Sequence, residues 1–178
     1  IKQMYPLDLE EFFWAMGVGK EAIDTARSYF HNQQSLPEKL HDRYLNLFKS
    51  YLLTGGLPDA VNQYVKDKNI QRMRDIQYDI HTLYGIDASQ YDQQNRLKIR
   101  RVYDLIPSNL ENKKKRVVVK KIENKMGKQF SDYEYEFDYL VESGIALQID
   151  AISNPRFPLL QSVKKTLLKL YLNDVGIL

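Results

Sequence analysis

The stretch from Ser131 to Ile149, SDYEYEFDYLVESGIALQI, decides the fold. Ser131 and Glu134 have the S-x-x-E spacing of a capping box, in which two side chains satisfy backbone N–H groups at a helix start. Apolar residues then recur on one helical face, at the i, i+4, i+7 and i+8 positions Tyr133, Phe137, Leu140 and Val141. The pattern predicts a helix that begins at Ser131.

The residues after this helix predict a strand. Gly144 lies where a helix usually ends through a left-handed residue. Beyond it, apolar and polar residues alternate, which is typical of a half-buried strand: Ile145, Leu147 and Ile149 against Ala146, Gln148 and Asp150. A helix that passes through glycine into a strand is typical of the third helix and first wing strand of a winged-helix unit.

The upstream residues predict the earlier parts of the same unit. Leu97 to Ile106 has helical spacing and is expected to end at Pro107, and the β-branched run Val117 to Val119 suits a short strand. A brief helix follows through Ile122 and Met126. Leu167 to Leu172 is strand-like and could return as the second wing strand.

Residues 1 to about 90 are predicted to be almost entirely helical, with short turns between the helices. A helix is predicted from Ile70 to Leu83, with Gly85 as its breaker. The predicted fold class is therefore mainly α: a helical bundle followed by a winged helix (α+β) with a small β-wing.

Composition limits the classes of protein to which the chain can belong. Of 178 residues, 43% are hydrophobic and 28% charged, no apolar run approaches the roughly 20 residues of a membrane span, and the first residues lack the pattern of a signal peptide. There is no cysteine, so disulfides and thiolate metal sites are excluded. We expect a cytoplasmic protein without a membrane partner. Because the chain begins at Ile1 and ends in an apolar run, we expect it to be a piece of a longer protein.

Motifs for catalysis, cofactors and metals are missing. The turn from Gly17 to Glu21 lacks the first glycine of a P-loop and has a carboxylate where the hydroxyl should stand. His31, His41 and His81 do not cluster with other ligand-type residues. With neither a cysteine nucleophile nor a G-x-S-x-G elbow, we predict no catalytic, cofactor or metal site in this chain, and no enzyme activity of its own.

The clearest charge feature is a basic stretch from Arg96 to Lys125, with eleven Lys and Arg against three acids. Such a cluster can follow a phosphate backbone with an affinity that depends on salt and not on sequence. The predicted third helix instead carries five acids and no cation from Ser131 to Glu142, which opposes its insertion into a DNA groove. The candidate nucleic-acid-binding residues are therefore those of the basic link and the short helix after it: Lys113, Lys114, Lys115, Arg116, Lys120 and Lys121. The other interpretation is a solvated link in a winged unit that contacts protein.

Three stretches together resemble a large group of prokaryotic AAA+ ATPases. MYPLDLEEFFWAMG (residues 4–17) is similar to the segment that follows the ATPase core in that group, and YLLTGGLPDAV (51–61) to its Y-L-x-x-G-G-x-P-x-A-V motif. The run from IQYDI (76–80) to the C-terminal LKLYLNDVGIL (168–178) is similar to the group's partner domain of unknown function.

The resemblance implies a parent chain with an N-terminal ATPase core that binds ATP and Mg, and a C-terminal domain similar to restriction endonucleases. The domains expected here are a lid-like helical region (1–66), a winged helix (67–165) and a strand (166–178) that leads into the nuclease-like domain, an alternative to the second wing strand. The leading hypothesis is a non-catalytic interaction module of such an ATPase, with the core and the nuclease-like domain as its partners. The alternative is a free-standing winged-helix regulator that binds nucleic acid.

Overall fold

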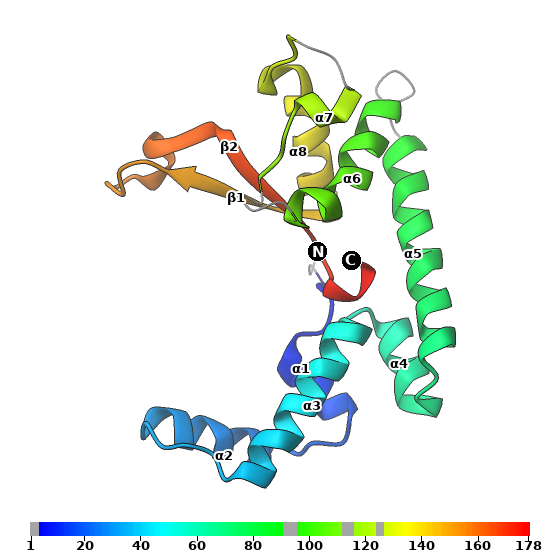
Figure 1. Cartoon of the computed structure of the whole chain (residues 1–178), viewed down its shortest axis with the longest axis vertical. Coiled ribbons are helices and arrows are strands. Elements are labelled where there is room, and N and C mark those ends of the chain that lie inside the picture. Colours follow the sequence, from blue (N-terminus) through cyan, green and yellow to red (C-terminus); the bar gives the residue numbers. More distant parts are fainter. Residues whose placement is uncertain (1–3, 91–95, 112–115, 124–126) are drawn as a thin grey trace. The chain divides into compact units, whose positions relative to one another are not determined.

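The computed structural model describes residues 4–90, 96–111, 116–123 and 127–178 (Figure 1). The described residues are mainly helical, with a small antiparallel sheet near the C-terminal end, as the sequence predicts. They form two compact units, residues 1–80 with 174–178 (unit 1) and residues 81–173 (unit 2). The long helix α5 (Ile70–Gln90) belongs to both units, which are described separately below.

Unit 1 is made of short helices. They are α1 (Leu9–Ala15), α2 (Lys20–His31), α3 (Glu38–Thr54), α4 (Pro58–Asp67), the first part of α5 and the 3₁₀ turn η3 (Val175–Ile177). The helices predicted for this region are confirmed. A capping box starts α1, because Glu11 donates its backbone N–H to Asp8 Oδ1 (2.9 Å) and Asp8 donates its own to Glu11 Oε2 (3.0 Å).

The core of unit 1 lies where α1 meets α3 and α4. Phe12 and Phe13 are buried next to Val61, and two tyrosines of α3 pack on the phenylalanine rings. The ring centroids of Phe12 and Tyr51 are 5.4 Å apart, and those of Phe13 and Tyr44 are 5.9 Å apart. These aromatic pairs hold α1 against α3.

A buried carboxylate closes unit 1 at the turn between α3 and α4. Asp174 is 4% exposed and accepts the backbone N–H of Gly56 (2.5 Å) and of Gly176 (2.8 Å). Burial raises the pKa of the Asp174 carboxyl, while the two backbone hydrogen bonds act in the opposite direction. We call the turn Thr54–Leu57 together with Asp174–Ile177 the Gly-Gly junction.

Other backbone groups at the Gly-Gly junction are also satisfied within unit 1. Gln77 of α5 donates its amide N–H groups to the carbonyls of Leu53 (3.0 Å) and Thr54 (2.8 Å) at the end of α3. Leu7 donates its backbone N–H to Gly56 O (2.7 Å). The junction therefore ties together segments that are far apart in the sequence.

Unit 2 has the element order of a winged helix. After the last part of α5 come α6 (Arg96–Glu111), α7 (Lys120–Glu123), the 3₁₀ turn η1 (Phe130–Tyr133), α8 (Glu134–Glu142), β1 (Ala146–Ile152), the turn η2 (Leu159–Ser162) and β2 (Val163–Leu172). The strands pair antiparallel, with Ala146 opposite Leu172 and a shift in register between Asp150 and Ala151. Val117 donates its backbone N–H to Leu168 O (3.1 Å), so the segment predicted as a short strand lies beside β2.

The position of β2 decides between the two interpretations of Leu167 to Leu172. These residues are in β2 and pair with β1, so they form the second wing strand. The first part of α5 and residues 174–178 belong to unit 1, and the domain boundary at residue 66 stays a prediction. Whether a further domain follows stays a prediction.

Two predicted helix ends are wrong. Helix α5 continues through Gly85 to Gln90, and α6 continues through Pro107 to Glu111. A Cβ at Gly85 would collide with the Arg100 guanidinium of α6, so the glycine allows close packing inside the helix. Pro107 lacks an N–H donor and its ring crowds the carbonyl four residues earlier, but the buried Ile106 before it keeps α6 packed in the core.

The predicted capping box at Ser131 is also wrong. Gln129 donates its backbone N–H to Asp132 Oδ2 (2.9 Å) at the start of η1, and α8 begins only at Glu134. The predicted exit at Gly144 is confirmed, since this glycine has φ +75°. The expected core face is confirmed for Tyr133, Phe137 and Leu140, which are buried.

The predicted apolar face of the strand is wrong after Ile145, the residue that precedes β1. Ile145 is buried, but Leu147 and Ile149 are 50% and 53% exposed. The inner face of the sheet is supplied by alternate leucines of β2, which lie opposite Ala146, Gln148 and Asp150: Leu168, Leu170 and Leu172. Ala146 is buried, so the side of β1 that faces the core is the one with Ala146, and not the one with Leu147 and Ile149 that the alternation predicts.

We predict that Gly55→Ala destabilises unit 1 strongly. Gly55 has φ +68°, and an added Cβ would collide with the Asp174 carboxylate. A left-handed conformation alone costs a non-glycine residue about 1–3 kcal/mol, and the collision adds to this. Urea unfolding should show a loss of about 3 kcal/mol or more. Gly19→Ala is the matched control, because nothing lies within 4 Å of its added Cβ; equal losses for the two variants would contradict the prediction.

Candidate binding groove of the winged-helix unit

The structure describes three of the six predicted nucleic-acid-binding residues. Lys113, Lys114 and Lys115 lie outside the described residues, whereas Arg116, Lys120 and Lys121 are exposed. No ion pair joins these three cations to any acid that the structure describes. Arg116 and Lys120 line a groove in unit 2, and Lys121 stands beside it on α7.

The groove has a volume of about 1110 Å³ and an apolar floor. It lies among the segment 116–120, the start of α8 and the inner face of the β1–β2 hairpin. The floor is formed by residues that are almost fully buried: Val117, Val119, Phe137 and Leu168. Phe130 is half-buried at the groove, and its ring centroid lies 5.6 Å from that of Phe137.

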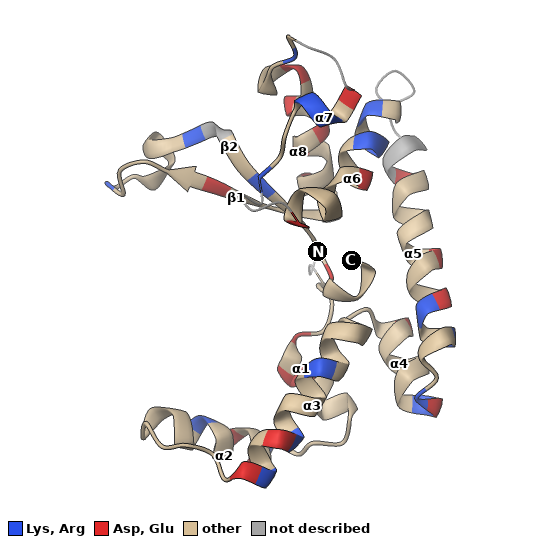
Figure 2. Cartoon of the chain, in the orientation of Figure 1, with Lys and Arg blue, Asp and Glu red and all other residues tan. Residues whose placement is uncertain are grey.

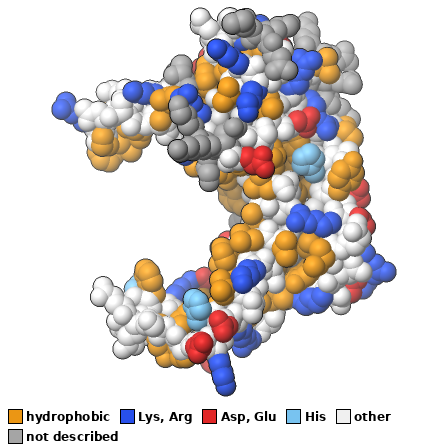
Figure 3. Space-filling view, in the orientation of Figure 1, with side chains coloured by type: hydrophobic (Ala, Val, Ile, Leu, Met, Phe, Trp, Pro, Cys, Tyr) orange, Lys and Arg blue, Asp and Glu red, His pale blue; other side chains and the backbone are white. Residues whose placement is uncertain are grey.

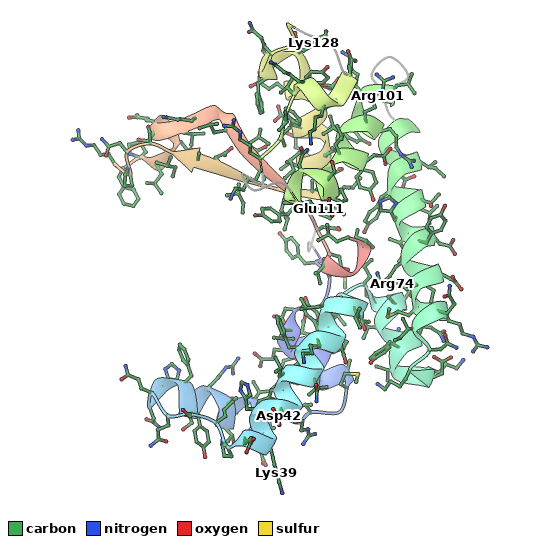
Figure 4. The ribbon with its side chains drawn as sticks, viewed as in Figure 1. Lys39, Asp42, Arg74, Arg101, Glu111 and Lys128 are labelled. Atoms are coloured by element: carbon green, nitrogen blue, oxygen red, sulfur yellow. The ribbon has the colours of Figure 1, made fainter. Side chains whose placement is uncertain are left out.

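Three cations line the groove, and we call Arg116, Lys120 and Lys128 the cationic wall. The hydrogen bond between Val117 and Leu168 fixes the chain next to Arg116, and α7 begins at Lys120. Lys128 follows Gly127, whose φ of +85° turns the chain toward η1 (Figure 4). Figure 2 shows the Lys and Arg positions on α7 and on the chain leading to it in blue.

Three acids line the same groove, and we call Glu134, Asp138 and Asp150 the acidic wall. Asp138 is exposed on α8. Asp150 of β1 accepts a hydrogen bond from the Gln148 amide (2.8 Å), which fixes its carboxylate at the groove. The groove therefore combines both signs of charge around an apolar floor, a combination that suits a ligand with an anionic side and an apolar side.

One acid of α8 lies inside the fold and not on an outer face of the helix. Glu136 is 2% exposed, and Lys98 Nζ of α6 lies 3.8 Å from its Oε1. A second ion pair joins Arg101 Nη1 to Glu123 Oε1 (3.7 Å). Burial raises the pKa of the Tyr133 hydroxyl, and the Glu123 carboxylate raises it further. This cluster stabilises the packing of α6, α7 and α8.

The other residues considered for nucleotide or metal binding include the turn after Gly17 and His81, which have structural roles. Gly17 to Gly19 forms the turn between α1 and α2, with Gly17 at φ +78°. The ring of His81 packs on Tyr103 with centroids 5.0 Å apart, and burial lowers the pKa of His81. Within the described ranges, no group of three or more His, Asp or Glu side chains could hold a metal ion. No described helix has the length and apolar character needed to cross a bilayer.

Sequence reasoning misses part of the groove. Lys128 lies outside the predicted link, and neither Phe130 nor Asp150 belongs to a recognisable motif. Their shared position depends on how β1 and η1 pack, which no local pattern encodes. The signal that could have found Asp150 is its alternation with Gln148 along β1, which places both side chains on one face.

These features define a mainly helical protein with a winged-helix unit that carries a mixed-charge groove. Residues 45–178 match the model of a family described as a domain of unknown function, DUF8612. The chain belongs to this family. No curated protein and no solved structure matches the chain significantly.

We predict that Lys98→Met destabilises unit 2 by about 2–3 kcal/mol. The change leaves the Glu136 carboxylate buried without its cation, and breaking a fully buried pair costs about 3–5 kcal/mol; water that reaches Lys98 lowers this figure. The double variant Lys98→Met/Glu136→Leu should recover most of the loss in urea unfolding, because it removes both charges. A single variant as stable as the wild type, or as the control Lys39→Met on α3, would contradict the role of the pair.

Proposed function

We propose that this chain is a non-catalytic interaction module of a larger AAA+ type ATPase, in which the helices of unit 1 act as a lid-like region and the winged helix contacts a partner. The proposal is supported by the resemblance of YLLTGGLPDAV (51–61) and its flanking stretches to such ATPases. The nucleotide and Mg would be held by a separate ATPase core, and a nuclease-like domain would be the second partner in the same parent chain.

The observation that carries this proposal is that polar groups of the segment 51–61 form hydrogen bonds within unit 1. Tyr51 donates its hydroxyl to Leu7 O (3.0 Å), Gly56 donates its N–H to Asp174, and the Thr54 carbonyl accepts from Gln77. Since these groups of the motif bond within unit 1, they are not available for a substrate. The motif holds segments of unit 1 together, which supports a structural role for it in the proposed module.

We predict that the isolated chain does not bind Mg-ATP. The turn Gly17–Gly19 lacks the P-loop pattern, and Glu21 after it would repel phosphate. Isothermal calorimetry with Mg-ATP should show no binding heat, and micromolar affinity would overturn the proposal that the module is non-catalytic. The upstream reading frame gives an independent test: an in-frame P-loop supports an ATPase parent, and a start codon at Ile1 supports a free-standing regulator.

A second candidate function is nucleic-acid contact through the basic link. Its specific support is the distribution of charge: residues 81–173 contain sixteen Lys and Arg against eleven acids, whereas the rest of the chain has ten against twelve. Arg116, Lys120 and Lys121 are exposed, with no ion pair to a described acid. Unpaired cations of this kind bind phosphates by counterion release.

For this candidate, we predict that changing Lys113, Lys114, Lys115 and Arg116 to Gln removes most nucleic-acid affinity. Binding should be weak, indifferent to sequence and lower at high salt, and the log–log salt slope should fall by up to about one for each phosphate that the variant no longer neutralises. Fluorescence anisotropy at several salt concentrations measures both quantities. Folding should be retained in circular dichroism. Sequence-selective binding that survives this change would place the interface elsewhere.

A further inference from the structure

We propose that the groove of unit 2 binds single-stranded nucleic acid, with phosphates on the cationic wall and bases over the apolar floor. The inference rests on the nucleic-acid contact proposed above and specifies its site and its ligand. It uses residues outside the predicted link, above all Lys128, Phe130 and Asp138.

The apolar floor between charged residues favours a single strand over a duplex. Phosphates are attracted by Arg116, Lys120 and Lys128 and repelled by the acidic wall. A duplex keeps its bases paired and stacked inside, so it cannot lay them over the apolar floor. A single strand can place unpaired bases over the floor and the Phe130 ring while its phosphates reach Arg116, Lys120 or Lys128.

The floor supplies a surface for the bases. Phe130 is half-buried and is supported by the buried Phe137, so one part of its ring is fixed and another part remains accessible. Aromatic rings in such positions stack with bases in proteins that bind single strands. Figure 3 shows hydrophobic side chains and Lys and Arg side by side on the upper part of the molecule, where α6, α7 and α8 lie in Figure 1.

The acidic wall adds a base preference. Carboxylates accept hydrogen bonds from the exocyclic amino group of cytosine, whereas thymine offers a carbonyl at the same position. Asp138 is exposed on α8, and the Asp150 carboxylate is fixed by Gln148 (2.8 Å). A strand of cytosines should therefore bind more tightly than a strand of thymines of the same length.

The test uses fluorescence anisotropy of the whole chain with labelled oligo-dC, oligo-dT and a mixed-sequence duplex of equal length. The wild type should prefer oligo-dC to oligo-dT, and both to the duplex. Phe130→Leu should weaken single-strand binding by about tenfold with the salt slope unchanged, because it removes one base stack and no charge. Lys128→Gln should lower the slope by up to about 0.7, and Asp138→Ala should remove the oligo-dC preference and raise duplex affinity.

Two matched controls lie away from the groove. Lys39→Gln removes an exposed cation of α3, and Glu142→Ala removes an exposed acid of α8 that does not line the groove; neither should change the affinities. Wild-type binding of the duplex as tight as that of the single strands, or affinities unaffected by Phe130→Leu and Lys128→Gln, would overturn this inference while leaving contact through the basic link intact. No binding of any strand at low salt would overturn both proposals.

Discussion

The hydrogen bonds of the Asp174 carboxylate to the backbone of Gly56 and Gly176 hold unit 1 closed. The carboxylate is buried, so its charge is stabilised mainly by these two N–H donors. The turn can present its N–H groups in this way because no side chain stands at Gly55 or Gly56. The packing of α3, α4 and α5 around the junction depends on that arrangement.

In unit 2, some charged side chains form ion pairs inside the helix packing and others stay exposed. Two glutamates, Glu123 and Glu136, pair with cations of α6 and stabilise helix packing, while the cations of the link and α7 that the structure describes stay exposed. Asp138 of α8 is exposed beside the groove. An acidic helix of this kind is unsuited to the major groove of a duplex.

The sequence predicts the fold class and most helices because these depend on local periodicity and on Gly and Pro residues near the ends of helices. It fails where packing overrides a local signal. Gly85 and Pro107 look like helix ends, yet contacts with Arg100 and the burial of Ile106 let both helices continue. Alternation alone assigns the wrong face to β1, because the buried Ala146 reverses it. Part of the groove is predicted through Arg116 and Lys120, whereas Lys128, Phe130 and Asp150 meet only in three dimensions.

The discontinuity of unit 1 has a consequence for how the chain folds during synthesis. Gly56 and Asp174 are 118 residues apart, and all of unit 2 lies between them in the sequence. When the helices of unit 1 leave the ribosome, the turn at Gly55 and Gly56 still lacks the carboxylate that satisfies it. Unit 2 can fold first as an uninterrupted segment, and unit 1 reaches its final state only when residues 174–178 have been made. Until then the turn is open to solvent and to chaperones, so unit 1, whose helices are made before unit 2, is the later of the two units to be completed.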